Sequence, residues 1–215
     1  MRLLITSGGT REPIDDVRYV GNVATGSTGA SLAAEAVRRF HTVFLLSGTG
    51  SVLPPRWVYD TGLLVPRTFT STASLLESAE AICATGIDAV IATAAVADFT
   101  PERHSGKYSS HEPELVVRMV PAPKVIDRIR EWLPEATLVA FKLETAVSGA
   151  ELAARARRTM ARAGANYIVA NDLMGAGEDA HPACILGPND MSLPVARRSE
   201  LASKLLDLLE QRRTR

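Results

Sequence analysis

The sequence predicts an α/β protein built on a doubly wound, mostly parallel sheet, with helices on both faces and a hairpin near the C-terminus. Two observations predict this class. Short apolar runs alternate along the chain with segments whose apolar residues recur at helical spacing. Some runs are apolar at almost every position, as in DAVIATA at 88–94, which is typical of parallel strands covered on both faces. The architecture is therefore Rossmann-like, and residues 1–215 are expected to form one domain.

The first predicted strand is Arg2–Thr6, which ends in the turn Ser7-Gly8-Gly9-Thr10. Ser71 or Thr72 is a plausible N-cap, and Gly86 a stop, for one helix. Helices are expected at Ser27–Phe40, Ser71–Thr85, Pro123–Leu133, Gly149–Ala163 and Ser199–Arg213. Further strands are expected at His41–Ser47, Leu63–Phe69, Asp88–Ala94, Thr137–Lys142 and Tyr167–Asn171, with a terminal hairpin of Ala183–Gly187 and Met191–Val195, while Glu114–Val120 alternates less cleanly.

Composition narrows the classes of partner. The 24 basic and 24 acidic residues cancel, which argues against nucleic acid as a partner. Gly8 and Gly9 interrupt the N-terminal apolar run, and no later run reaches the length of a membrane span, so a cytoplasmic protein without membrane contact is expected. The two cysteines and four histidines show no metal-ligand spacing. We therefore expect buried free thiols, surface or capping histidines, and no metal site built from protein ligands.

Small and polar residues follow the predicted strands. Gly8-Gly9-Thr10 follows the first, Ser47-Gly48 the second, and Ala94-Ala95 with Asp98 a later one. Parallel sheets bind ligands outside the carboxyl ends of their strands, where glycine turns and helix N-termini offer free N–H donors to phosphate. Roughly fifteen residues separate Gly9 from Gly26-Ser27-Thr28-Gly29, unlike the tight dinucleotide fingerprint. The sequence therefore predicts a nucleotide crevice, with the nucleotide left open.

Seven blocks occur in a specific order and spacing. They are LITSGGTREPIDDVRYVGNVATGSTG (4–29), LLSG (45–48), ATAAVADF (92–99), SGKYSS (105–110), LVVRMVPAPKVI (115–126), VAFKLET (139–145) and YIVAND (167–172). Together they resemble the phosphopantothenoylcysteine synthetases, the phosphopantothenate–cysteine ligases of coenzyme A biosynthesis, over nearly the whole chain. The resemblance implies a flap around residues 100–120. Because the chain begins at the ligase strand, it also implies a monofunctional form without a flavin site.

The resemblance implies an acyl activation. The carboxylate of 4'-phosphopantothenate attacks the α-phosphate of ATP or CTP, pyrophosphate leaves, and the amine of L-cysteine then displaces the nucleoside monophosphate. Mg²⁺ is expected to accompany the triphosphate. Such chemistry needs cationic side chains and backbone donors rather than a protein nucleophile. A homodimer is also expected, because the family pairs through its sheet edge or terminal hairpin and the flap can complete a neighbouring site.

Site residues follow from the matched positions. Asn22 and Lys107 correspond to catalytic residues, although Ser109 and Ser110 replace later lysines of the flap motif. Arg158 and Arg162 keep the i, i+4 spacing of two triphosphate-binding lysines, with Arg155 or Arg157 as alternatives. Asn22, Ala95 and Lys107 are expected at the substrate; the expected nucleotide-binding set is Gly8, Gly9, Thr10, Ser47, Gly48, Ala94, Ala95, Asp98, Pro123, Lys124, Val125, Ile126, Phe141, Arg158 and Arg162.

Two departures keep other functions open. The segment 25–28 lacks a lysine found in many members, so Thr25, Ser27 and Thr28 would supply neutral donors, and a non-catalytic nucleotide-binding protein is one alternative. An NAD(P)-dependent oxidoreductase is another. That class should show a tighter glycine fingerprint and an acidic residue closing the second strand, whereas this strand ends in Leu46-Ser47-Gly48.

Overall fold

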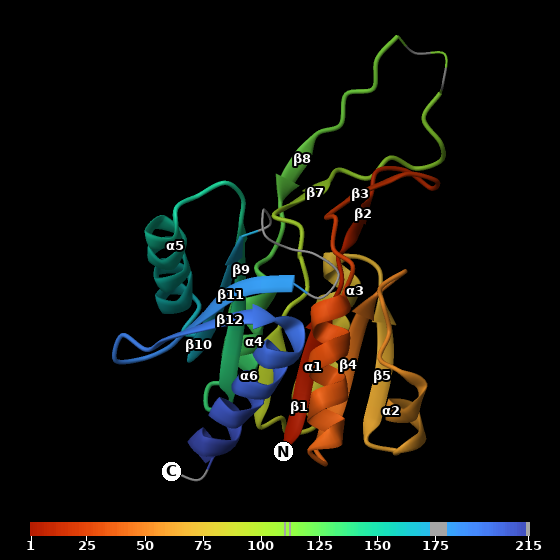
Figure 1. Cartoon of the computed structure of the whole chain (residues 1–215). Helices are drawn as coiled ribbons and strands as arrows, with labels where there is room; N and C mark the ends of the chain where they lie inside the picture. The colour runs from red at the N-terminus through yellow and green to blue at the C-terminus, as the bar shows by residue number, and fades with distance from the viewer. Residues whose placement is uncertain (110, 112, 173–179, 214–215) are drawn as a thin grey trace.

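An eight-stranded sheet runs through the centre of the protein (Figure 1). The computed structural model describes residues 1–109, 111, 113–172 and 180–213. The strand order is β12-β11-β10-β9-β6-β1-β4-β5. Strands β5, β4, β1, β6, β9 and β10 pair in parallel, whereas β11 and β12 are antiparallel to their neighbours. The doubly wound, mostly parallel sheet and its C-terminal hairpin are thereby confirmed.

The sheet strands follow the predicted apolar runs closely. The strands of the central sheet are β1 (Arg2–Ser7), β4 (Thr42–Gly48), β5 (Leu64–Phe69), β6 (Ala89–Ala92), β9 (Thr137–Glu144), β10 (Tyr167–Asp172), β11 (Ala180–Leu186) and β12 (Ser192–Arg197). The helices are α1 (Ser27–Arg38), α2 (Arg56–Asp60), α3 (Thr72–Cys83), α4 (Val125–Trp132), α5 (Gly149–Arg162) and α6 (Arg198–Arg213).

Helices cover both faces of the sheet, as Figure 1 shows for α1 and α6 on one side and α3 and α4 on the other. Alternate residues of β1 supply the two cores. Leu3 and Ile5 pack in the cluster with α1 and α6, while Leu4 packs in the cluster with α3 and α4. All three side chains are fully buried, so a strand buried on both faces explains the unbroken apolar run. A third cluster packs α5 against β9 and β10.

The direction of winding changes between β1 and β6. From β1 the chain adds β4 and β5 on one side, and from β6 it adds β9 and β10 on the other. At such a switch point the loops leaving the two strands diverge and open a crevice at their carboxyl ends. The structure therefore places the candidate site where β1 and β6 end.

Two small hairpins rise from that same edge. Strands β2 (Arg11–Pro13) and β3 (Tyr19–Gly21) form one, and β7 (Phe99–Pro101) and β8 (Met119–Pro121) form the base of a long flap (Figure 1). Only the last three residues of that flap's return strand pair, so the strand expected across Glu114–Val120 is confined to its end. Segments of three residues are too short to show a strand period, which is why the sequence did not predict strands β2, β3 and β7.

Several local expectations were wrong. The notion of the C-terminal hairpin as a surface free for pairing overlooked α6, which packs against it through Ile185 and Val195. His41 and His181 are buried rather than at the surface, and Cys184 is only half-buried. Helix α4 begins at Val125, with an extended Lys124 as its N-cap, so Pro123 lies before the helix. Within the described ranges, no helix is long and apolar enough to cross a membrane.

Candidate functional site

The loops that leave β1 and β6 are joined by backbone hydrogen bonds. The N–H of Ala95 donates to the carbonyl of Gly8 (2.8 Å), and the N–H of Thr10 donates to the carbonyl of Ala95 (3.2 Å). The buried hydroxyl of Thr10 accepts from the N–H of Ala97 (3.1 Å). These contacts bring Gly8, Gly9 and Thr10 together with Ala94 and Ala95, as the sequence predicted, and they fix the floor of the crevice.

Glycine is required at two positions of this floor by the protein's own packing. A Cβ on Gly9 would lie 2.8 Å from the carbonyl oxygen of Asn22, and one on Gly48 would lie 2.5 Å from the carbonyl oxygen of Gly9. Real Cβ atoms do not approach backbone oxygen so closely. The two glycines therefore let three backbone segments meet, and Asn22 is held against the end of β1.

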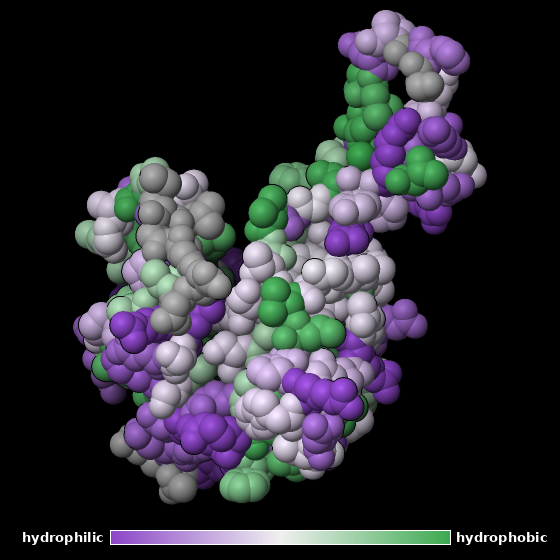
Figure 2. Space-filling model, turned by 45° about the vertical axis from the view of Figure 1, so that its right-hand side comes forward, coloured by the Kyte–Doolittle hydropathy of each residue, from purple (hydrophilic) through white to green (hydrophobic). Residues whose placement is uncertain are grey.

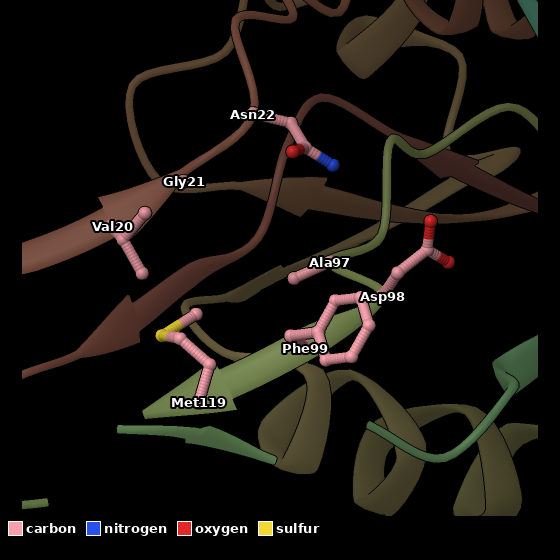
Figure 3. Close-up of a pocket in the computed structure, with 7 residues that line it drawn as sticks. All are labelled: Val20, Gly21, Asn22, Ala97, Asp98, Phe99 and Met119. Carbon is pink, nitrogen blue, oxygen red and sulfur yellow. The ribbon is translucent and has the colours of Figure 1, made fainter. Parts of the chain in front are cut away.

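A pocket of about 240 Å³ opens beside Asn22 (Figure 3). Asn22 and Asp98 lie on one side of it, and the side chains of Val20, Phe99 and Met119 lie on the other. Both polar side chains are exposed to solvent. The arrangement offers an amide and a carboxylate next to an apolar wall, which suits a ligand that combines a reacting polar group with an aliphatic chain.

The residues that precede helix α4 contact Asp98, one of the residues that line this pocket. The ammonium group of Lys124, the N-cap, forms an ion pair with the carboxylate of Asp98, and the N–H of Ala122 donates to the Asp98 carbonyl (2.9 Å). Lys124 makes no side-chain cap on α4, so the N–H groups of Val125 and Ile126 begin the helix without one. Asp98 and residues 123–126, which the sequence predicted for the nucleotide, thus lie together.

A second pocket, of about 270 Å³, lies between the end of β9 and helix α5. Four of its side chains are cationic and one is a carboxylate, so it suits a polyanion. Arg155, Arg158 and Arg162 share this face of α5, whereas Arg157 turns away and donates to the carbonyls of Gly187 (3.3 Å) and Met191 (3.4 Å). The pocket is lined by Lys142, Glu144, Arg155, Arg158, Thr159 and Arg162.

Two carboxylates hold the cations of this pocket in place. Glu144 lies 3.0 Å from the ammonium of Lys142 and 2.9 Å from the guanidinium of Arg155, and Asp127 of α4 accepts two hydrogen bonds from Arg162 (2.7 and 2.6 Å). The hydrogen bond from Lys142 lowers the pKa of Glu144 below its ordinary value, and the charges of Lys142 and Arg155 add to the effect against burial. Arg158 makes no hydrogen bond or ion pair with the described residues, which leaves it available to a ligand.

Lys107 lies outside both pockets. It is exposed on the flap, and its neighbours Gly106 and Tyr108 are hydrogen bonded to the loop between β2 and β3. That loop is the end of the hairpin remote from Asn22, which follows β3 directly. The described residues therefore do not bring Lys107 and Asn22 of one chain into one pocket.

The N-terminus of α1 also faces the carboxyl edge of the sheet. Gly26, with φ of +81°, precedes the helix without a side-chain cap, and Ser7 donates from its hydroxyl to the Gly26 carbonyl (2.9 Å). The Thr25 and Ser27 hydroxyls are hydrogen bonded to each other (3.0 Å) and exposed or half-buried. Neutral hydroxyls are thus present where the resemblance implies a lysine, and the hydroxyl of Thr25 also accepts from the N–H of Ser27 (3.3 Å).

Other expected residues lie near the site without lining either pocket. Ser47 is buried beside Ser7 in the β1–β4 register, and Phe141 is half-buried against the core below α1 and α6. Sequence reasoning missed eight pocket residues, although Lys142 and Glu144 stand in the matched block VAFKLET; the eight are Val20, Gly21, Ala97, Phe99, Met119, Lys142, Glu144 and Thr159. An apolar side chain in a short hairpin has no sequence signal that separates it from core.

A family model described as "DNA/pantothenate metabolism flavoprotein C-terminal domain" matches residues 1–212. The chain belongs to this family. The match confirms the resemblance carried by the sequence blocks. A coenzyme A biosynthesis bifunctional protein CoaBC from Thermococcus kodakarensis is 35% identical over 213 residues, which cover 98% of this chain and 51% of the relative. The chain therefore spans about half the length of the curated relatives it matches.

Solved structures of the family share the fold. A DNA/pantothenate metabolism flavoprotein from Streptococcus pneumoniae is 27% identical, with a TM-score of 0.89 over 98% of this chain and 99% of that one. The C-terminal domain of a CoaBC protein is 25% identical, with a TM-score of 0.79 over 98% of this chain and 94% of that one. These two solved structures thus share the overall fold of this chain.

Proposed function

We propose that the protein is a phosphopantothenate–cysteine ligase of coenzyme A biosynthesis. The observation that carries the proposal is the pairing of two pockets in a chain of this family: one with an amide, a carboxylate and an apolar wall at Asn22, and one with four cations at α5. Coenzyme A biosynthesis is the activity named for the CoaBC relative. An acid activated by a nucleoside triphosphate needs both kinds of surface.

The cationic and the polar side chains of the two pockets are proposed to bind different parts of the substrates. Arg158, Arg162 and Lys142 are proposed to hold the triphosphate and to stabilise the pyrophosphate that leaves, because this pocket gathers cations and pyrophosphate carries several negative charges. Asp98 and the N-terminus of α4 hold the rest of the nucleotide. Asn22 donates its amide N–H₂ to the activated acyl group while the amine of cysteine attacks it. Catalysis by position and charge requires no protein nucleophile.

Mg²⁺ fits this site as a companion of the triphosphate. Among residues 1–109, 111, 113–172 and 180–213, no group of three or more His, Cys, Asp or Glu side chains is arranged to hold a metal ion. Mg²⁺ in nucleotide sites is commonly held by phosphate oxygens, water and one or two carboxylates. Bound in that way it would neutralise phosphate charge, and Glu144 and Asp127 are the carboxylates beside the cationic pocket that could contact its water shell.

The protein is also proposed to act as a homodimer. Apolar side chains line the flap and the β2–β3 hairpin, and Figure 2 shows this flap standing out from the body with hydrophobic surface along it. Exposed apolar surface of this kind favours association with another chain. In a dimer, Lys107 of one subunit would reach the site of the other subunit. The exposed side chains are Val17, Tyr19, Val20, Phe99, Leu115, Val116 and Met119.

Mixing two impaired variants tests the shared site. Asn22→Ala and Lys107→Ala are each expected to keep only about 1% of wild-type activity, and mixed dimers would contain one site with both native residues. Recovery of activity to about one quarter of wild type on mixing is expected for random pairing. No recovery in a mixture shown to exchange subunits, or a monomer by sedimentation at micromolar concentration, contradicts the shared-site dimer.

The activity itself is tested with purified protein, Mg²⁺, 4'-phosphopantothenate and either ATP or CTP, with and without L-cysteine. We expect phosphopantothenoylcysteine to form with one equivalent of pyrophosphate, and the better nucleotide identifies the physiological one. A folded protein that binds a nucleotide but forms no product with either triphosphate would favour a non-catalytic nucleotide-binding role.

A further inference from the structure

Two neighbouring carboxylates of the β2–β3 loop hold the flap on both sides of Lys107. The N–H of Tyr108 donates to Asp15 (3.1 Å), and the N–H of Gly106 donates to Asp16 (3.1 Å). The N–H of Asp16 donates back to the carbonyl of Gly106 (3.1 Å). We call these contacts, together with those that Arg103 and His104 make with residues 14–16, the flap clasp.

The clasp continues towards the base of the flap. The guanidinium of Arg103 donates to Asp16 (2.8 Å), and the N–H of His104 donates to the carbonyl of Ile14 (2.9 Å). The rings of His104 and Tyr108 stack with their centroids 4.1 Å apart. Residues 103–108 therefore have a defined path along residues 14–16, and Lys107 is exposed at a fixed position on it.

Asp15 is built for this contact. Its side chain is buried, with 2% of the residue exposed, and its oxygens also accept from the N–H groups of Val17 (2.9 Å) and Arg18 (2.7 Å) and from the Arg18 guanidinium (3.2 Å). Burial opposes the charged form, but the hydrogen bonds from Val17, Tyr108 and Arg18 outweigh it and lower the pKa. One carboxylate thus joins the loop that leads into β3 with the residue that follows Lys107.

We propose that Asp15 and Asp16 are positioning residues that hold Lys107, through the backbone on either side of it, in the geometry required for the reaction. This inference rests on the proposed ligase function and on the role of Lys107 in it. The clasp lies outside the three hydrophobic cores, since none of them contains a residue of 14–18 or 103–108. Its loss should therefore leave the sheet folded.

The test begins with Asp15→Asn, and Glu114→Gln is the matched control. Glu114 is exposed on the same flap and outside the clasp, so its replacement makes the same change in charge. Asp15→Asn is expected to lower kcat by about 10- to 100-fold, the scale for misplacing a catalytic group by about 1 Å, with the nucleotide KM changed less than about twofold. Should Asp15→Asn fail to fold, the more exposed Asp16→Asn replaces it, with the same expectation.

A double-mutant cycle separates positioning from general damage. If Asp15 acts through Lys107, Asp15→Asn causes no further loss of kcat in a Lys107→Ala background. Losses that multiply would overturn the proposal. So would a Lys107→Ala variant with normal kcat, and that result would leave ligase activity itself standing.

Amide hydrogen exchange tests the flap clasp independently of any activity measurement. Asp15→Asn should raise exchange at Tyr108 by about 10-fold or more, whereas Glu114→Gln should not. Unchanged exchange at Tyr108 would show that Asp15 does not hold the flap and would overturn the proposal. If the two variants show the expected exchange at Tyr108 but the wild-type protein has no ligase activity, the proposed function is refuted, whereas the contact between Asp15 and the flap is still supported.

Discussion

Replacing one arginine of α5 tests whether the cationic pocket holds the triphosphate. Arg157 and Arg158 are neighbours with the same charge, but only Arg158 lines the pocket, while Arg157 donates to the Gly187 and Met191 carbonyls. A hydrogen bond to a charged group contributes about 1.5–3 kcal/mol, and solvent at the exposed Arg158 reduces this to about 1.5 kcal/mol. Arg158→Gln should therefore raise the nucleotide KM about 10-fold.

The assay is steady-state pyrophosphate release at varied nucleotide concentration and constant ionic strength. Arg157→Gln is expected to keep KM within about twofold and to lose only a few tenths of a kcal/mol to about 1 kcal/mol of stability, because its carbonyl contacts are long. Added salt should shrink the difference between wild type and Arg158→Gln, since exposed charges are screened. Equal KM values for the two variants would refute the assignment of phosphate to this face of α5.

Three further outcomes follow from the site and the fold. Asn22→Ala should slow amide formation about 100-fold while nucleotide binding stays nearly intact, and an unchanged rate would remove Asn22 from the mechanism. Lys107→Ala should impair turnover with almost no change in Tm, since an exposed flap lysine contributes little to folding; a variant that unfolds would make Lys107 structural. Burial lowers the pKa of His41 from its ordinary value of 6.5, despite its hydrogen bond with Glu210. Neutral His41 therefore contributes to folding stability above pH 6.5, and this contribution is lost as the pH falls towards the lower pKa of the folded protein. In urea unfolding over this pH range, the free energy of unfolding of His41→Gln should fall less than that of wild type.

The sheet could be predicted because its strands are long and buried on both faces. Leu3, Leu4 and Ile5 must all be apolar when both sides of β1 are covered, so the run is visible in the sequence. The β2–β3 hairpin could not be found in the same way, because its strands have three residues each and all of β3 is exposed. Nothing in such a segment repeats often enough to show a period.

The candidate site was predictable where it follows from strand ends, and less so elsewhere. Ala95 and Thr10 meet because β1 and β6 are parallel neighbours. The choice between Arg157 and Arg158 depends on the rotation of α5, which a one-residue uncertainty in register leaves open. Asp15 and Tyr108 are 93 residues apart in the sequence. Because their contact joins a side chain to a backbone N–H, no pattern of residue types in the sequence indicates it.

The central claim is that the carboxylate of 4'-phosphopantothenate is activated as an acyl-nucleotidylate. It is tested most directly by labelling both carboxylate oxygens with ¹⁸O and analysing the products by mass spectrometry. The account predicts one ¹⁸O in the phosphate of the nucleoside monophosphate, one in the new amide and none in pyrophosphate. Label in inorganic phosphate together with a nucleoside diphosphate would contradict it, because the carboxylate would then have attacked the γ-phosphate.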